Sequence, residues 1–140
     1  MSFTVAHDEG HKVAVLSHEG SVDVAEIHRS RLELNEAAHR YRTNGVIIDI
    51  TGSIIEASPV EIIENVEGLV GDLRPDMRLA FVSEDEAAQS TVSMIVATVA
   101  HTCGTRVGQF NDLQTAKCWI SHKDQAVAAA CGCLPLSHAA

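Results

Sequence analysis

The sequence predicts a single α/β domain: a mixed, mostly parallel sheet of about five strands flanked by about four helices, in the order ββαβαβαβα. Three observations support this. Strand-like and helix-like patterns alternate along the chain after an opening hairpin. The length of 140 residues, 46% of them hydrophobic, is enough for one core but not for two. No apolar run reaches the length of about 18 residues that a membrane-spanning helix needs.

The first elements are a hairpin and a long helix. Residues 3–7 and 12–18 are rich in β-branched side chains, and Asp8-Glu9-Gly10 between them has the composition of a turn. The apolar period then becomes helical over about residues 22–42, and Asn44-Gly45 ends that helix. The apolar stripe of the helix consists of Val24, Ile27, Leu34, Ala38 and Tyr41.

A buried strand and a capped helix follow. Residues 46–50 form a short apolar run that is typical of a central parallel strand. Ser58, Pro59 and Glu61 form a helix start, because Ser58 and Glu61 have capping-box spacing and proline suits the first turn. This pattern predicts that Ser58 caps the second helix.

The second half repeats the alternation. Strands are expected at 78–82 and 106–110, with a helix between them, and a final helix capped by Asn111 or Asp112 carries Trp119 as a core anchor. Periodic burial stops near Lys123. We therefore expect the domain at 1–123 and a tail or helix extension at 124–140.

Charge and cysteine content narrow the function classes. The net charge of −9 disfavours binding to nucleic acid or to anionic membrane surfaces. The N-terminus lacks the pattern of a signal peptide, so a cytoplasmic location is expected. Reduced thiols are then the default, and Cys131 and Cys133 are expected to be incidental residues of the tail. The four cysteines are Cys103, Cys118, Cys131 and Cys133.

Two segments carry a family resemblance. Residues 45–52, Gly-Val-Ile-Ile-Asp-Ile-Thr-Gly, look like the strand that leads into the functional loop of STAS domains. Residues 106–120 are similar to the closing strand and helix of SpoIIAA-like proteins, with Phe110 before a short acidic turn and a helix that contains Ala116 and Trp119. The chain thus resembles the SpoIIAA-like branch of the STAS family over about residues 2–122.

This resemblance implies a non-enzymatic module that binds a protein partner. In anti-sigma-factor antagonists of the family, a serine in the pattern Asp-Ser-Ser-Gly is phosphorylated, close to the surface that contacts a kinase. The corresponding stretch here is Glu56-Ala57-Ser58-Pro59, which keeps only Ser58 as a hydroxyl. The expected partner-binding or switch loop therefore contains Asp49, Thr51, Ser53 and Ser58. The fold relation to CRAL-TRIO lipid carriers implies a carrier or sensor of a small apolar ligand as an alternative.

The residues themselves favour structural roles for the two main candidates. Asp49 ends a strand, where open α/β sheets bind ligands, but the sequence places no second catalytic group beside it. We expect its carboxylate to accept loop N–H groups, and a small enzyme with a site near Asp49 is the third alternative. No phosphate-binding glycine loop, nucleophile elbow or metal-binding histidine pair occurs, so no cofactor and no metal are expected. A homodimer is left open.

Overall fold

The computed structural model describes residues 3–103, 107–121 and 137–139, and describes the side chains of these except at 86–88, 100–103 and 137–139. Within these ranges the chain forms four helices and eight strands. The strands are β1 (Phe3–Asp8), β2 (Val13–His18), β3 (Gly20–Asp23), β4 (Gly45–Asp49), β5 (Ser53–Glu56), β6 (Arg78–Val82), β7 (Val107–Phe110) and β8 (Ser137–Ala139). The helices are α1 (Val24–Arg40), α2 (Pro59–Asp72), α3 (Glu86–Cys103) and α4 (Leu113–Ser121).

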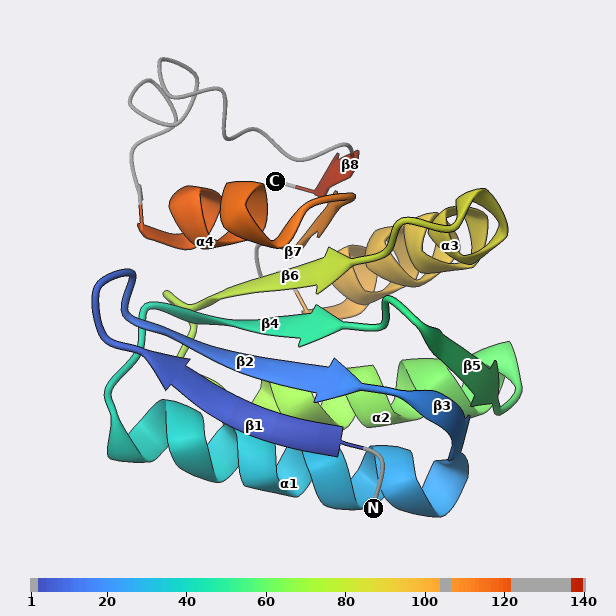
Figure 1. Cartoon of the computed structure of the whole chain (residues 1–140), viewed down its shortest axis with the longest axis horizontal. Helices are drawn as coiled ribbons and strands as arrows, with labels where there is room; N and C mark the ends of the chain where they lie inside the picture. The colour runs from blue at the N-terminus through green and yellow to red at the C-terminus, as the bar shows by residue number, and fades with distance from the viewer. Residues whose placement is uncertain (1–2, 104–106, 122–136, 140) are drawn as a thin grey trace.

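The predicted fold class is confirmed. The main sheet has the order β1-β2-β4-β6-β7-β8, in which β2, β4, β6 and β7 are parallel and the edge strands β1 and β8 are antiparallel to their neighbours. The predicted hairpin is β1 and β2 (Figure 1). Since the inner strands are joined through helices, their carboxyl ends lie along one edge of the sheet.

The sheet separates two hydrophobic cores. One face packs against α1, α2 and α3, through residues such as Leu34, Leu69 and Ile95. The other face is covered by α4, where Trp119 and Ile120 are fully buried against the sheet (Figure 1). The prediction that Trp119 is a core anchor is confirmed. Successive side chains of a strand point to opposite faces of the sheet, and helices cover both faces, so β2 and β4 carry apolar residues on both sides.

Two short strands, β3 and β5, differ from the sequence-based expectation. β3 and β5 form a separate two-stranded parallel sheet, whereas residues 22–23 were expected in a helix and 53–56 in a loop. Helix α1 begins only at Val24, because the side chain of Asp23 accepts the backbone N–H of Glu26 and caps it. A two-stranded pairing of four residues each leaves no periodicity in either segment, so only the tertiary structure reveals it.

The C-terminal residues also include a strand. Ser137–Ala139 pair antiparallel with β7, so part of the segment expected as a tail adds to the sheet. Three residues are too few for a period of two to be visible in the sequence. Residues 122–136, including Cys131 and Cys133, lie outside the described part of the chain, and the boundary at residue 123 stays a prediction.

The expectation of reduced thiols is wrong for one cysteine. Cys118 on α4 is part of a disulfide, whose other half lies outside the described side chains. Spacing along the chain does not tell which cysteines the fold brings together, since a disulfide needs Cα atoms only about 4.4–6.8 Å apart.

No described helix is long and apolar enough to cross a membrane.

Candidate functional site

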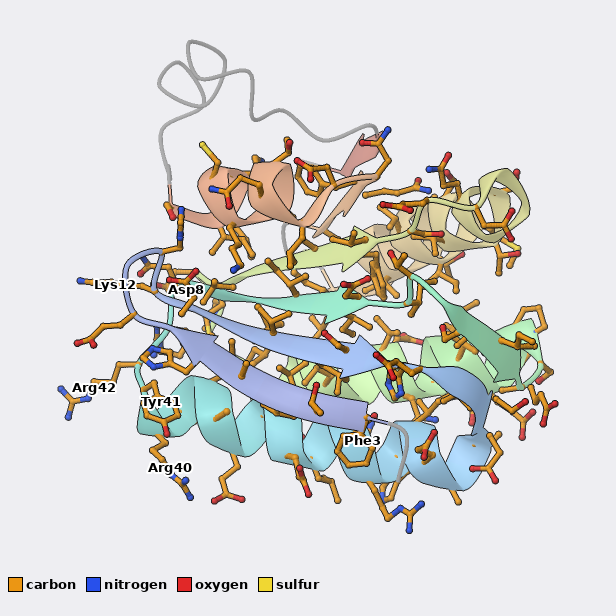
Figure 2. All side chains as sticks on the ribbon, viewed as in Figure 1. Phe3, Asp8, Lys12, Arg40, Tyr41 and Arg42 are labelled. Carbon is orange, nitrogen blue, oxygen red and sulfur yellow. The ribbon has the colours of Figure 1, made fainter. Side chains whose placement is uncertain are left out.

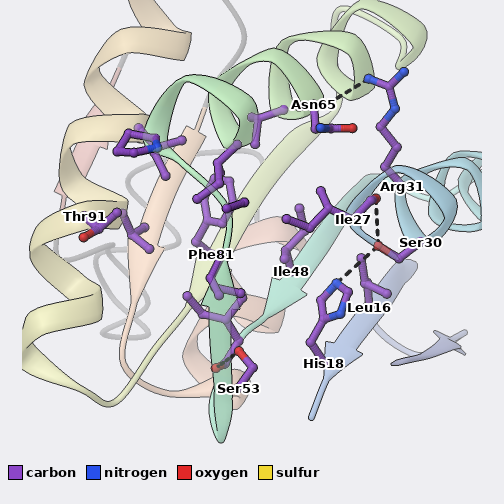
Figure 3. Close-up of a pocket in the computed structure, with 18 of the residues that line it drawn as sticks. Leu16, His18, Ile27, Ser30, Arg31, Ile48, Ser53, Asn65, Phe81 and Thr91 are labelled. Carbon is purple, nitrogen blue, oxygen red and sulfur yellow. Dashed lines mark hydrogen bonds between the residues drawn. The ribbon is translucent and has the colours of Figure 1, made fainter. Parts of the chain in front are cut away.

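A cavity lies on the helical side of the sheet, near the carboxyl ends of β2, β4 and β6. Its volume is about 470 Å³, within the usual range of ligand pockets. The sheet, α1, α2, α3 and the segment from β5 into α2 all contribute to its wall (Figure 3). The wall is mostly aliphatic and aromatic, and its apolar members include Ile27, Ile48, Val66, Leu69, Phe81 and Ile95.

One polar group in this wall is His18, which ends β2. The side chain is 4% exposed, and burial lowers the pKa of its imidazole while the charge of Glu26 opposes the shift. His18 is therefore neutral near pH 7. Its Nε2 lies 3.2 Å from the hydroxyl oxygen of Ser30 on α1 (Figure 3).

The hydrogen bonds of Ser30 fix the tautomer of His18. The Ser30 hydroxyl has one hydrogen, which it donates to the carbonyl oxygen of Ile27 at 2.9 Å. The oxygen of Ser30 must then accept from Nε2–H of His18. The Nδ1 atom of His18 is left as a buried acceptor with no hydrogen-bond partner in the structure.

The second polar group is Arg31, which also comes from α1. Its Nη1 donates to the backbone carbonyl of Asn65 on α2 at 3.1 Å (Figure 3). The guanidinium fits between the helices because residue 68 is glycine: a Cβ atom there would lie 1.7 Å from Nη1. The Nε atom of Arg31 is buried without a hydrogen-bond partner. A buried donor without a hydrogen-bond partner costs about 1–3 kcal/mol.

The predicted switch loop lies next to this cavity, but of its four residues only Ser53 is among those that line the cavity. Asp49 Oδ1 accepts the N–H of Thr51 at 2.9 Å, which confirms the structural role expected for that carboxylate. Ser53 donates to the carbonyl of Ile50 at 2.6 Å and lines the cavity, whereas Thr51 is exposed in the turn. Ser58 caps α2 and is exposed. The four residues are thus not gathered into one reactive cluster.

A separate polar cluster joins the hairpin to α4. Asp8 lies 3.0 Å from Lys117 Nζ and 3.1 Å from His11 Nδ1, and Figure 2 shows Asp8 where β1 meets the turn. The hydrogen bond from Lys117 and the one from the backbone of His11 hold the pKa of Asp8 well below its usual range. This cluster ties two elements together. Among the described side chains, no group of three or more His, Cys, Asp or Glu residues is placed to hold a metal ion.

Structural comparison places this geometry in a known fold. The chain is similar to an anti-sigma factor antagonist from Mycobacterium paratuberculosis, with 16% identity and a TM-score of 0.58 over 82% of this chain and 91% of that one. The chain has a SpoIIAA-like fold. An uncharacterised protein of the DUF3478 family from Shewanella loihica, described as having that fold, matches with 13% identity and a TM-score of 0.57 over 85% of this chain and 92% of its own. No protein-family model and no curated protein matches the sequence.

Within this SpoIIAA-like fold, the apolar-ligand alternative implied a cavity between the sheet and the helices, but sequence reasoning missed two polar residues that line it, His18 and Arg31. A signal for Arg31 was present, because Ile27, Arg31 and Leu34 have helical spacing and the arginine interrupts the apolar stripe of α1. His18 gave no comparable signal, since a histidine at the end of a strand is common at a surface. Its burial depends on α1 folding back over the sheet.

Proposed function

We propose that this chain is a non-enzymatic regulatory module that binds a protein partner through the surface formed by β5 and the first turn of α2. The observation that carries the proposal is the exposure of two large apolar side chains there. Ile54 is 64% exposed and Val60 is 63% exposed, on either side of the Ser58 cap. Apolar side chains grouped on a surface mark interaction sites more often than scattered ones do. The similarity to an anti-sigma factor antagonist is consistent with such a role.

The absence of catalysis is part of this proposal. Asp49 is the candidate catalytic residue of the enzyme alternative, but its Oδ1 accepts a hydrogen bond from the turn that follows β4. In the described part of the chain, no hydrogen bond or ion pair links Asp49 to a histidine or a second carboxylate. A general acid or base would have to be within about 3 Å of its proton partner, directly or through one water.

Substitution of Val60 tests the proposed surface. Val60→Asp places a negative charge in the first turn of α2, where it interacts favourably with the helix dipole, so the fold should be kept. Leu32→Asp is the matched control, because Leu32 is also an exposed apolar residue, at 47%, but lies on α1. We expect quantitative pull-down of a partner from the source cells to fail with Val60→Asp and to succeed with Leu32→Asp. Equal capture by both variants would contradict the proposed surface.

The cavity favours a second candidate function, a carrier or sensor of a small apolar ligand. An apolar wall with a few polar groups, and a volume of about 470 Å³, is the usual form of a small-molecule site. Ile54 and Pro59 line the cavity and also belong to β5 and the first turn of α2, so a bound ligand would contact the proposed partner surface. Native mass spectrometry of the protein from its source cells should then show a bound small molecule. A mass equal to that of the chain alone, under conditions that preserve a known lipid complex, would count against this function.

A further inference from the structure

We propose that the ligand of the cavity is a carboxylic acid with an apolar body, and that Arg31 binds its carboxylate. This inference rests on the second candidate function, the binding of a small molecule in the cavity. Neither the fold nor the comparisons assign a ligand to this protein.

The hydrogen bonds of Arg31 leave its carboxylate-binding edge free. A guanidinium binds a carboxylate in a bidentate manner through two parallel N–H groups. The Nη1 atom already donates to Asn65, and this atom lies on the side of the group away from Nε–H. The edge formed by Nε and Nη2 makes no hydrogen bond to any residue that the structure describes, and Nε is buried. A carboxylate at this edge would supply acceptors for Nε and Nη2 and would leave the hydrogen bond from Nη1 to Asn65 in place.

Arg31 also forms no ion pair with another residue in the described part of the chain. The other charged side chain in the described wall is Asp85, which is exposed and directly precedes α3. His18 is neutral because burial lowers its pKa, so it adds no second positive charge. A single guanidinium suits a monoanion such as a carboxylate better than a phosphate dianion, which usually requires several cationic or N–H donors.

The apolar wall defines the rest of the ligand. Ile27, Ile48 and Phe81 line the space between the sheet and the helices and offer no hydrogen bond from their side chains. Since a water molecule's share of liquid volume is about 30 Å³, a cavity of 470 Å³ has room for roughly 15 non-hydrogen atoms. A medium-chain fatty acid has this size and this distribution of charge. Its chain would replace water against the apolar wall, which is favourable.

Calorimetric titration of the full chain with decanoate, 1-decanol and methyl decanoate tests whether the cavity prefers a ligand with a carboxylate. We expect decanoate to bind at least about tenfold more tightly than either uncharged probe, a difference of about 1.4 kcal/mol. This comparison needs only the wild-type protein, so it does not depend on the folding of any variant.

Two variants then test the role of Arg31. Arg31→Met should reduce the affinity for decanoate by about tenfold or more and leave the affinity for 1-decanol unchanged. Arg29→Met is the matched control, because it removes the same charge from an exposed position of the same helix, and it should change neither affinity by more than about twofold.

The outcomes separate the inference from the function on which it rests. If all three probes bind with equal affinity and Arg31→Met leaves these affinities unchanged, the cavity binds apolar ligands, but the proposal that its ligand is a carboxylic acid is wrong. If decanoate is preferred but Arg29→Met weakens it as much as Arg31→Met does, the attraction is a general effect of charge and the site at Arg31 is wrong. If no probe binds up to about 1 mM, the ligand-binding function itself is wrong.

Discussion

Ser58 decides whether the switch of the anti-sigma factor antagonists could operate here, and its contacts allow the expected effects to be worked out. Its hydroxyl oxygen accepts the N–H of Glu61 at 3.3 Å, while Glu61 Oε1 accepts the N–H of Ser58 at 2.9 Å. The capping box predicted from the sequence is thus confirmed, with Pro59 in the first turn of α2. The cap is exposed and one of its hydrogen bonds is long, so its contribution should lie at or below the middle of the usual range.

We expect Ser58→Ala to lower the free energy of unfolding by about 1 kcal/mol. Val66, Leu69 and Val70 anchor α2 in the core, so the helix should persist without its cap. Ser58→Asp should be nearly neutral, because aspartate also caps and its charge suits the positive end of the helix dipole. Urea unfolding followed by circular dichroism measures both changes. In a thermal scan, the loss in Ser58→Ala should appear as a fall in Tm of roughly 2–8 °C.

A double-mutant cycle with Glu61→Ala tests the reciprocal contact. If the capping box acts as a unit, the two single losses should not add, and the double variant should lose less than their sum. Losses that add fully would show that the two hydrogen bonds are independent. A loss above about 3 kcal/mol in Ser58→Ala would refute the interpretation of Ser58 as an exposed cap.

Partner binding separates the cap from a regulatory switch. If the Ser58 hydroxyl is structural, wild type and Ser58→Ala should bind the same partner with equal affinity once both are folded. Ser58→Asp adds a charge between Ile54 and Val60, so a loss of binding in that variant would report on the proposed surface and not by itself on a switch. A phosphate on Ser58 in protein purified from its source cells, found by mass spectrometry, would instead indicate a phosphorylation switch. We expect no phosphate, because Ala57 and Pro59 stand where the family pattern has serine and glycine.

Three further predictions concern the core and two ionisable groups. Trp119→Ala should cost about 3–5 kcal/mol in urea unfolding, because the indole is fully buried beside the ring of Phe110, and emission typical of an exposed indole in the wild type would contradict this. The ion pair of Asp8 with Lys117 should make wild type more stable than Asp8→Asn by at most about 1 kcal/mol at pH 7. Because the folded-state pKa of Asp8 is lowered, that advantage should decline as the pH falls below 3.8 and be lost only below the folded-state pKa, and an advantage as large at pH 2 as at pH 7 would refute the assignment. The pKa of His18 is lowered too, so the unfolded state binds the proton of this histidine more tightly than the folded state does. The Tm of wild type should therefore fall relative to that of His18→Gln as the pH drops below 6.5. The same dependence of Tm on pH in both proteins would contradict the burial of His18.

The local signals of this sequence determined most of the architecture. A hydrophobic period of 3.6 residues placed the helices, and short apolar runs placed the central strands, because each element must turn an apolar face toward the core whatever its neighbours are. The cap at Ser58 was also visible, since a capping box involves residues only three positions apart. The same holds for Asp112, which directly precedes α4 and accepts the N–H of Thr115 at 3.0 Å.

Only the tertiary structure decided the features that depend on distant residues. The pairing of β3 with β5 joins segments about 30 positions apart, and neither segment has a period of its own. The cavity exists because α1, α2 and the β5 segment enclose the carboxyl ends of the inner strands. Arg31 could be seen in the sequence as a charge on an apolar stripe, but its free edge depends on Asn65 and Gly68 of another helix. Periodicity reports how one element faces the core, whereas the chemistry of a site is fixed by which elements meet there.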